Sequence, residues 1–219
     1  MRRTWRFVPL FGARFASLFA ALLLFAMLTA CEEDADVRVD AKDYDEAALI
    51  EAREEKDKAF RTSSDSPIPP AQRESFGGLR FYDPSADYYL IAAVTWHNPP
   101  DTIVIGTTMG GEQRKAIRAA TLSFKLNGQT SKLTGFRFID TPTPYEGMLF
   151  VPFRDATNGF ATYEAGRYMD VPLEQGDDSV AVDFNTAYHP LCLFNYAYSC
   201  PLPPTENTLP YKVEAGERK

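Results

Sequence analysis

Leu122-Ser123-Phe124-Lys125-Leu126-Asn127-Gly128 decides the fold of this 219-residue chain. Apolar residues occupy every second position up to the turn, which is the period of a strand with one buried face. Asn127-Gly128 favours a two-residue hairpin turn, because both positions tolerate positive φ. A return strand follows through Leu133, Phe136 and Phe138. The stretch therefore predicts an antiparallel strand pair.

Short β-prone segments continue on both sides of this hairpin, with Gly, Pro and Asn turns between them. No helical pattern separates them, so the sequence predicts a mainly β domain, an antiparallel sandwich or a barrel-like sheet. The expected strands are Leu79–Tyr82, Tyr88–Thr95, Thr102–Thr107, Ala116–Leu126, Met148–Phe153, Tyr163–Tyr168, Val180–Phe184 and Tyr211–Glu214.

One amphipathic helix is expected before the strands, over residues 43–62. Asp43 and Glu46 have the spacing of a capping box, in which each side chain satisfies a free backbone N–H. Asp57 and Arg61 form a favourable i,i+4 pair on the same helix. The prediction is a single domain over residues 43–219 with this helix at its start.

The N-terminal segment has the features of a secretory signal over residues 1–30. Arg2, Arg3 and Arg6 precede an apolar run from Phe15 to Met27. The run is shorter than the roughly 18 to 20 residues that span a bilayer, which disfavours the alternative of a transmembrane anchor.

The signal ends in Leu28-Thr29-Ala30-Cys31, which resembles the bacterial lipobox. This resemblance implies a lipoprotein whose Cys31 carries diacylglycerol and palmitate chains, and such chains hold a protein on a membrane. Residues 31–42 are acidic and without periodicity, and they are expected to form a tether. The domain would then face the periplasm or the exterior, with inner and outer membranes both left open.

The charge of the chain excludes one class of partner. It carries 23 Lys and Arg residues against 30 Asp and Glu, and four of the basic residues lie in the first 30 positions. The remaining 19 basic and 30 acidic residues give the exported part a net charge near −11. Because phosphate binding requires a basic surface, no nucleic-acid partner is expected. The membrane, reached through the lipid, is the one partner predicted.

Several segments of the exported part resemble, in one linear order, the bacterial and archaeal family named domain of unknown function 1684. The resemblance implies no activity, and the family usually carries Asn at the position of His189. The matching segments are Lys56-Asp57-Lys58-Ala59-Phe60, Ser66-Pro67-Ile68, Phe76-Gly77-Gly78-Leu79, Phe150-Val151-Pro152-Phe153-Arg154-Asp155, Thr162-Tyr163-Glu164-Ala165-Gly166-Arg167-Tyr168, Asp183-Phe184-Asn185-Thr186-Ala187-Tyr188-His189-Pro190 with Cys192, and Cys200-Pro201-Leu202-Pro203-Pro204-Thr205-Glu206-Asn207.

Polar residues that need partners when buried concentrate in residues 166–207, among prolines that stiffen the loops. The predicted binding cluster is Arg167, Asp183, Asn185, Tyr188, His189, Glu206 and Asn207, with Asp170 in the same segment. The alternative is a structural cluster in which Arg167 pairs with Asp183 or Glu206 and the Asn side chains hold backbone segments together.

Cys192 and Cys200, with seven residues between them, allow three interpretations. A disulfide is the simplest in an exported protein. A metal site with His189 and Glu206 fits poorly, because zinc ligands usually lie closer together in sequence. A nucleophilic cysteine activated by His189 is the third. No cofactor or metal is predicted.

The sequence therefore predicts a lipid-anchored envelope protein that is a ligand-binding or structural β domain. The alternative is a hydrolase-like enzyme that uses Arg167, Asp183, Tyr188 and Glu206. The residue patterns identify neither a ligand nor a catalytic residue, because the known nucleophile and phosphate-binding motifs are missing from the sequence.

Overall fold

The computed structural model describes residues 43–139 and 147–219. The predicted signal peptide, Cys31 and the tether lie outside these residues. In the described ranges, no helix is long and apolar enough to cross a membrane.

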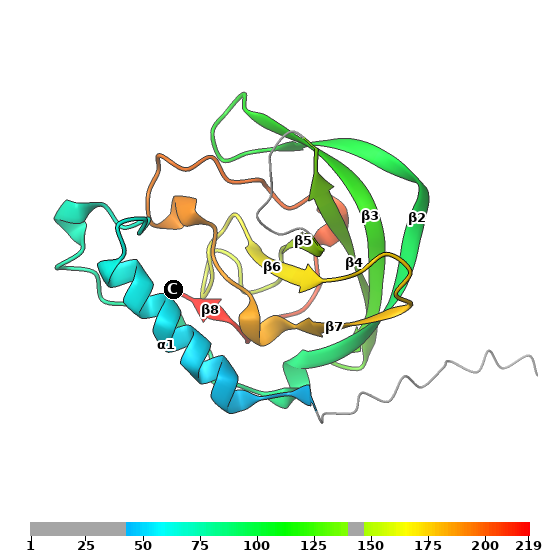
Figure 1. Ribbon diagram of the computed structural model, residues 1–219, viewed down its shortest axis with the longest axis horizontal. Helices are drawn as coiled ribbons and strands as arrows, with labels where there is room; N and C mark the ends of the chain where they lie inside the picture. Colours follow the sequence, from blue (N-terminus) through cyan, green and yellow to red (C-terminus); the bar gives the residue numbers. More distant parts are fainter. Residues whose placement is uncertain (1–42, 140–146) are drawn as a thin grey trace, which may run out of the picture. The chain divides into compact units, whose positions relative to one another are not determined.

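A six-stranded antiparallel sheet, in the order β6-β5-β4-β3-β2-β7, dominates the fold. It curves until its two edges nearly meet, and Tyr168 of β6 and Tyr188, just after β7, exchange backbone hydrogen bonds of 2.9 Å (Figure 1). The prediction of a mainly β, barrel-like sheet is confirmed. The strands are β2 Tyr89–Gly106, β3 Gln113–Leu126, β4 Gln129–Phe138, β5 Met148–Phe153, β6 Arg167–Pro172 and β7 Ser179–Asp183.

The predicted hairpin joins β3 to β4. Asn127 has φ 54° and Gly128 has φ 75°, the positive values that a type I′ turn requires. Leu122 faces Leu133 and Leu126 faces Gln129 across the pair. The turn residues thus set the register that the alternation predicted.

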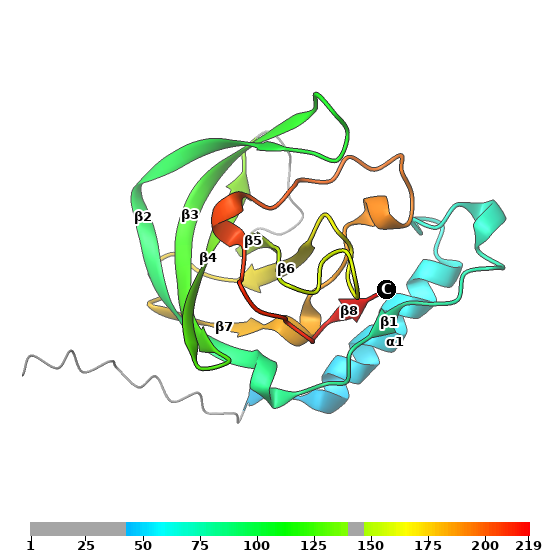
Figure 2. The same cartoon turned by 180° about the vertical axis from the view of Figure 1, so that it is seen from behind.

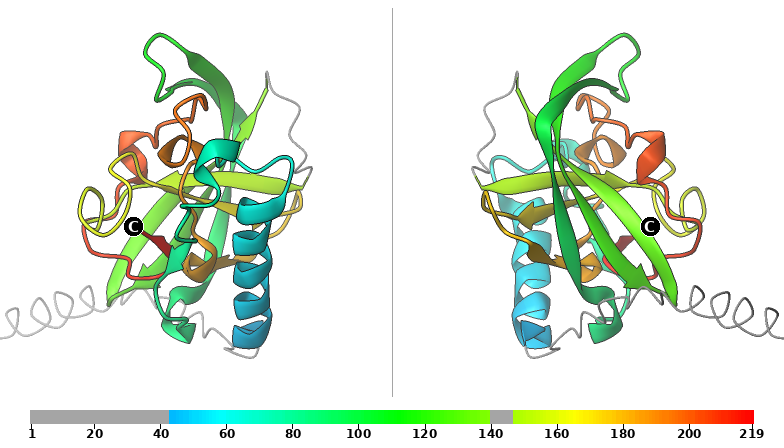
Figure 3. Two further views of the ribbon diagram at one scale, coloured as in Figure 1. Left: turned by 90° about the vertical axis from the view of Figure 1, so that its left-hand side faces the viewer. Right: turned by 90° about the vertical axis from the view of Figure 1, so that its right-hand side faces the viewer.

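A second, two-stranded sheet pairs β1 (Arg80–Phe81) with β8 (Glu217–Arg218) near the C-terminus (Figure 2). The helix α1 (Glu46–Thr62) lies on the side of the molecule opposite the long strands β2 and β3 (Figure 3). Short 3-10 turns span Pro70–Gln72, Ala86–Tyr88, Phe184–Thr186, Leu191–Leu193 and Thr205–Asn207.

The start of α1 corrects one prediction. Asp45, not Asp43, is the N-cap, and its Oδ1 accepts a hydrogen bond from the Ala48 N–H at 3.0 Å. The predicted capping box of Asp43 and Glu46 is therefore wrong, because Glu46 is already the first helical residue. The Asp57–Arg61 pair is confirmed, with 2.7 Å between Oδ2 and Nε.

A second prediction is corrected at β2. One unbroken strand, Tyr89–Gly106, takes the place of the two expected strands Tyr88–Thr95 and Thr102–Thr107. The register with β3 shifts between Trp96 and Asp101, which places Pro99 and Pro100 in a bulge. Pairing with β7 on the other side of β2 has already ended at Ala93. Proline is tolerated there because no ladder partner needs its missing N–H.

Two further predicted strands differ. Tyr163 to Gly166 forms a turn, closed by the Gly166 N–H donating to the Tyr163 carbonyl at 3.1 Å, so β6 begins only at Arg167. The expected last strand, Tyr211–Glu214, is irregular, and the final strand is β8 instead.

The sheet has two different faces along β5 and β6. Leu149, Val151 and Met169 point into the main core, which fills the inside of the curved sheet. Their alternate neighbours Phe150 and Tyr168 point outward into a separate aromatic cluster. A pocket therefore lies on the outer face of the sheet.

Candidate functional site

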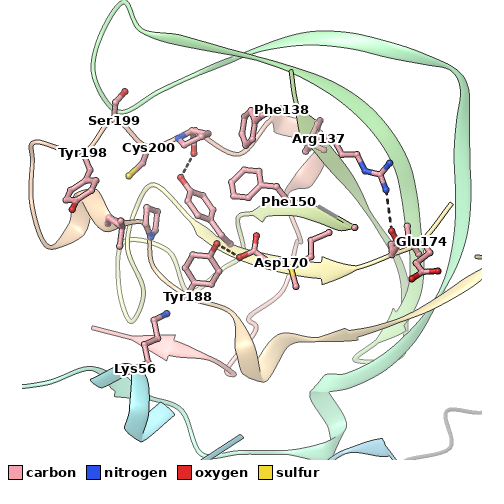
Figure 4. A pocket seen from close by; sticks show the side chains of 18 of the residues that line it. Lys56, Arg137, Phe138, Phe150, Asp170, Glu174, Tyr188, Tyr198, Ser199 and Cys200 are labelled. Atoms are coloured by element: carbon pink, nitrogen blue, oxygen red, sulfur yellow. Dashed lines mark hydrogen bonds between the residues drawn. The ribbon is translucent and has the colours of Figure 1, made fainter. Parts of the chain in front are cut away.

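A pocket of about 940 Å³ lies against the outer face of the sheet. Its floor is the outer face of β4, β5 and β6, and its walls come from α1 and from residues 188–201 (Figure 4). This is within the size range of small-molecule sites. The lining side chains that the site depends on are Lys56, Phe60, Arg137, Phe138, Phe150, Tyr168, Asp170, Glu174, Tyr188, Leu191, Tyr198 and Cys200.

Four aromatic rings form a continuous chain along this pocket. The centroids of Phe138 and Phe150 lie 5.2 Å apart. Phe150 meets Tyr168 at 4.7 Å, and Tyr168 meets Tyr188 at 5.8 Å, both edge to face. Such pairs hold each other's orientation, so the ring faces are fixed before any ligand enters.

Asp170 lies among these rings and is opposite Phe150 in the register of β5 and β6. Its Oδ2 accepts a hydrogen bond of 2.7 Å from the Tyr188 hydroxyl (Figure 4). Within the described part of the chain, no basic side chain forms an ion pair with it. Desolvation by burial raises the pKa of Asp170 above its ordinary value, opposed by the Tyr188 hydrogen bond and by Lys56.

Lys56 enters the pocket from α1 but is already paired. Its Nζ lies 2.7 Å from Oε1 of Glu217, a buried carboxylate, and 4.6 Å from the centroid of the Tyr188 ring. The other Glu217 oxygen accepts the His189 backbone N–H at 2.7 Å. The Lys56 charge is therefore balanced by Glu217, and the charge of Asp170 is not balanced by a contact.

Arg167, predicted for the binding cluster, is fully buried and does not line the pocket. Its Nη2 lies 2.8 Å from Asp155 Oδ2, so the expected partners Asp183 and Glu206 are wrong. Its guanidinium also donates to the carbonyls of Val213, Ala215 and Glu217. Arg167 thus fastens the C-terminal segment to the sheet through three of its backbone carbonyls.

Both predicted asparagines tie backbone segments together. Asn207, with no exposed surface, joins β4 to β5, since its Nδ2 donates to Thr134 O at 2.8 Å and Pro152 O at 2.7 Å. Asn185 bonds the backbone of Ser85 through both its Oδ1 and its Nδ2. These contacts are what the structural interpretation of the cluster expected.

The remaining acids of the cluster have separate partners. Asp183 caps the short turn at Phe184–Thr186 by accepting from the Asn185 N–H at 2.9 Å. Glu206 forms an ion pair with Arg118 at 2.9 Å. Arg167, Asp183, Tyr188 and Glu206 thus each engage a different partner, and the geometry supplies no shared site for the hydrolase alternative.

His189 is buried beside a second, smaller pocket of about 230 Å³. Its Nε2 accepts the Tyr163 N–H at 3.2 Å, and its Nδ1 lies 3.5 Å from Glu217 Oε2. Desolvation by burial, then the nearby charges of Arg167 and Lys56, lower its pKa to about 3. His189 is therefore a neutral acceptor whose ring nitrogens contact Tyr163 and Glu217.

Cys192 and Cys200 are buried, adjacent thiols, and they are unbonded in this structure. The Cys192 N–H donates to the Cys200 Sγ at 3.2 Å. Hydrogen bonding between the thiols lowers the pKa of Cys192 and raises that of Cys200. The predicted disulfide stays a prediction. In the described ranges no three His, Cys, Asp or Glu side chains gather as metal ligands.

The pocket residues that sequence reasoning missed come from distant segments. Tyr188 is the one member of the predicted cluster that lines the large pocket. Asp170 lay in the polar segment but outside the predicted cluster. Its alternation with the core residue Met169 could have placed it beside Tyr168 on the outer face. No sequence signal brings Lys56 to this place.

The fold and site together define a class: a small, nearly closed antiparallel β domain with an aromatic pocket on the outside of its sheet. The family model described as "Protein of unknown function (DUF1684)" matches residues 74–218, and the chain belongs to this family. The resemblance to this family is thereby confirmed for residues 74–218, whereas the segments 56–60 and 66–68 lie before the matched range.

A solved structure supports the same assignment. The chain is 41% identical to an uncharacterized protein of Haloarcula marismortui, whose solution NMR structure aligns with a TM-score of 0.63. The match covers 80% of this chain and 94% of the other. No curated protein matches the chain.

Proposed function

We propose that this protein is a lipid-anchored binding protein of the cell envelope, which holds a small amphipathic molecule in its outer pocket. The observation that carries the proposal is the carboxylate of Asp170, without an ion-pair partner, in an aromatic-walled space of about 940 Å³. A structural cluster would pair this group, as it pairs Arg167 with Asp155. Apolar walls with a few placed polar groups are typical of ligand sites.

The binding step predicts that the pocket takes up a neutral apolar probe. N-phenyl-1-naphthylamine should gain fluorescence and raise the melting temperature of the exported domain. Leu191→Trp, which fills the pocket from its wall, should remove both effects. The control Val104→Trp places the same bulk on an exposed position of β2 and should keep them. Equal probe binding by both variants, or no binding by wild type, would refute the pocket.

The anchoring step rests on the Leu28-Thr29-Ala30-Cys31 sequence after the apolar run. Cys31→Ser should move the protein from the membrane fraction to the soluble fraction of the cells that make it. Mass spectrometry of the wild-type N-terminus should find an acylated Cys31 and no residue before it. An intact, unacylated Met1 in the wild-type protein would overturn the lipoprotein assignment.

A further inference from the structure

Two carboxylates that line the pocket form no ion pair among the described residues: Glu174, which is exposed, and Asp170, which lies among the rings. Lys56 is bound to Glu217 at 2.7 Å. Arg137, on the far wall, donates to the Leu173 carbonyl at 3.3 Å and lies 5.7 Å from the Trp96 ring centroid. Asp170 receives only the neutral Tyr188 hydroxyl from the described residues. Among the described residues, the Asp170 carboxylate beside the rings therefore has no ion-pair partner, and Lys56 acts on it only without direct contact.

The rings around Asp170 reinforce that charge. An aromatic ring presents a negative face, so it attracts a cation placed above it within about 6 Å. Phe150, Tyr168 and Tyr188 form a connected wall beside the carboxylate. The Lys56 ammonium, 4.6 Å from the Tyr188 centroid, shows that this ring already takes a cation on one side.

From this geometry we infer that the pocket recognises an organic cation, an amine or quaternary ammonium on an apolar body, with Asp170 as its counter-ion. The inference rests on the proposed binding function and names its ligand class. The cationic head would lie against Asp170 and the rings of Phe150 and Tyr188. The apolar body would extend along Phe138 and Leu191. The net acidity of the exported part would add attraction at long range.

A matched series of probes tests the inference on the exported domain by calorimetry. Benzyltrimethylammonium, benzyl alcohol and benzoate share one ring and differ in charge. The expected order of affinity is cation, then alcohol, then anion. Asp170→Asn should lower the affinity for the cation by about tenfold or more, because the charge is removed while the Asn amide oxygen can still accept the Tyr188 hydrogen bond. It should leave the alcohol unchanged.

Two further variants guard against a folding artefact. Phe150→Leu should lower the affinity for the cation by about threefold to tenfold, since the cation is attracted to the ring face. The affinity for the alcohol should fall less. Asp65→Asn, at an exposed position outside the pocket, should change neither. The melting temperature of Asp170→Asn should equal or exceed that of wild type, because a desolvated charge is removed.

The outcomes separate the two proposals. If N-phenyl-1-naphthylamine binds but benzyltrimethylammonium binds no better than benzoate, the cation inference fails and the binding function stands. An Asp170→Asn variant with full cation affinity would overturn the inference in the same way. If no probe binds to wild type, both fall together.

Discussion

Arg167→Met is expected to lower the free energy of unfolding by about 3–5 kcal/mol, the usual cost of removing one partner from a buried ion pair. Arg167 has no exposed surface, and Asp155, its partner at 2.8 Å, is buried as well. The substitution keeps much of the side-chain volume but leaves the Asp155 charge in the core. It also leaves the carbonyls of Val213 and Ala215 without their donor.

Urea denaturation followed by circular dichroism measures this loss. The double variant Arg167→Met with Asp155→Asn should be less destabilised than the sum of the two single variants, because the stranded charge is gone. Arg118→Met breaks two more exposed ion pairs, with Glu206 and Asp101, and should cost no more than about 2 kcal/mol. If Arg167→Met lowered the free energy of unfolding no more than Arg118→Met does, Arg167 would not be what holds the C-terminal segment to the sheet.

The central strands could be predicted because their signals are local. Alternation and the Asn127-Gly128 turn determine both the pairing and the register of β3 and β4. The errors arose where tertiary contacts override a local rule. A proline breaks a strand where a neighbouring strand needs its N–H as a hydrogen-bond donor. The pairing of β2 with β7 ends at Ala93, so no carbonyl of β7 needs a donor at Pro99 or Pro100. Residues 211–214 have strand propensity, but the Val213 carbonyl accepts from Arg167 and the Tyr211 carbonyl accepts from the Ala156 N–H.

The site was harder to predict, because a polar side chain that binds a ligand looks the same in sequence as one that holds backbone segments together. Asn185 and Asn207 look functional in sequence, yet irregular loops need such side chains to satisfy buried backbone groups. The pocket itself depends on a register, Phe150 opposite Asp170, and on α1 bringing Lys56 to the same face. Both depend on how distant segments pack, which residue types alone do not specify.

His189 is expected to make the domain sensitive to acid. In the unfolded chain a histidine takes up a proton near pH 6.5, whereas burial lowers the pKa of His189 in the folded domain to about 3. A proton on Nε2 would also meet the Tyr163 N–H that this nitrogen now accepts. The contribution of His189 to the free energy of unfolding is therefore fully present above about pH 6.5. It falls by about 1.4 kcal/mol per pH unit below that, until the pKa of the folded state is reached.

Urea unfolding of wild type and His189→Asn between about pH 7.5 and about pH 4.5 tests this, because Asn does not titrate in this range. The free energy of unfolding of wild type minus that of His189→Asn should fall by about 2 kcal/mol between neutral pH and about pH 5. Only wild type loses the contribution of the histidine. Asp170 and Asp183, whose pKa values are raised by burial, oppose the loss equally in both proteins. Parallel curves for wild type and His189→Asn would show that His189 takes up its proton without unfolding, and that its burial carries no penalty for charge.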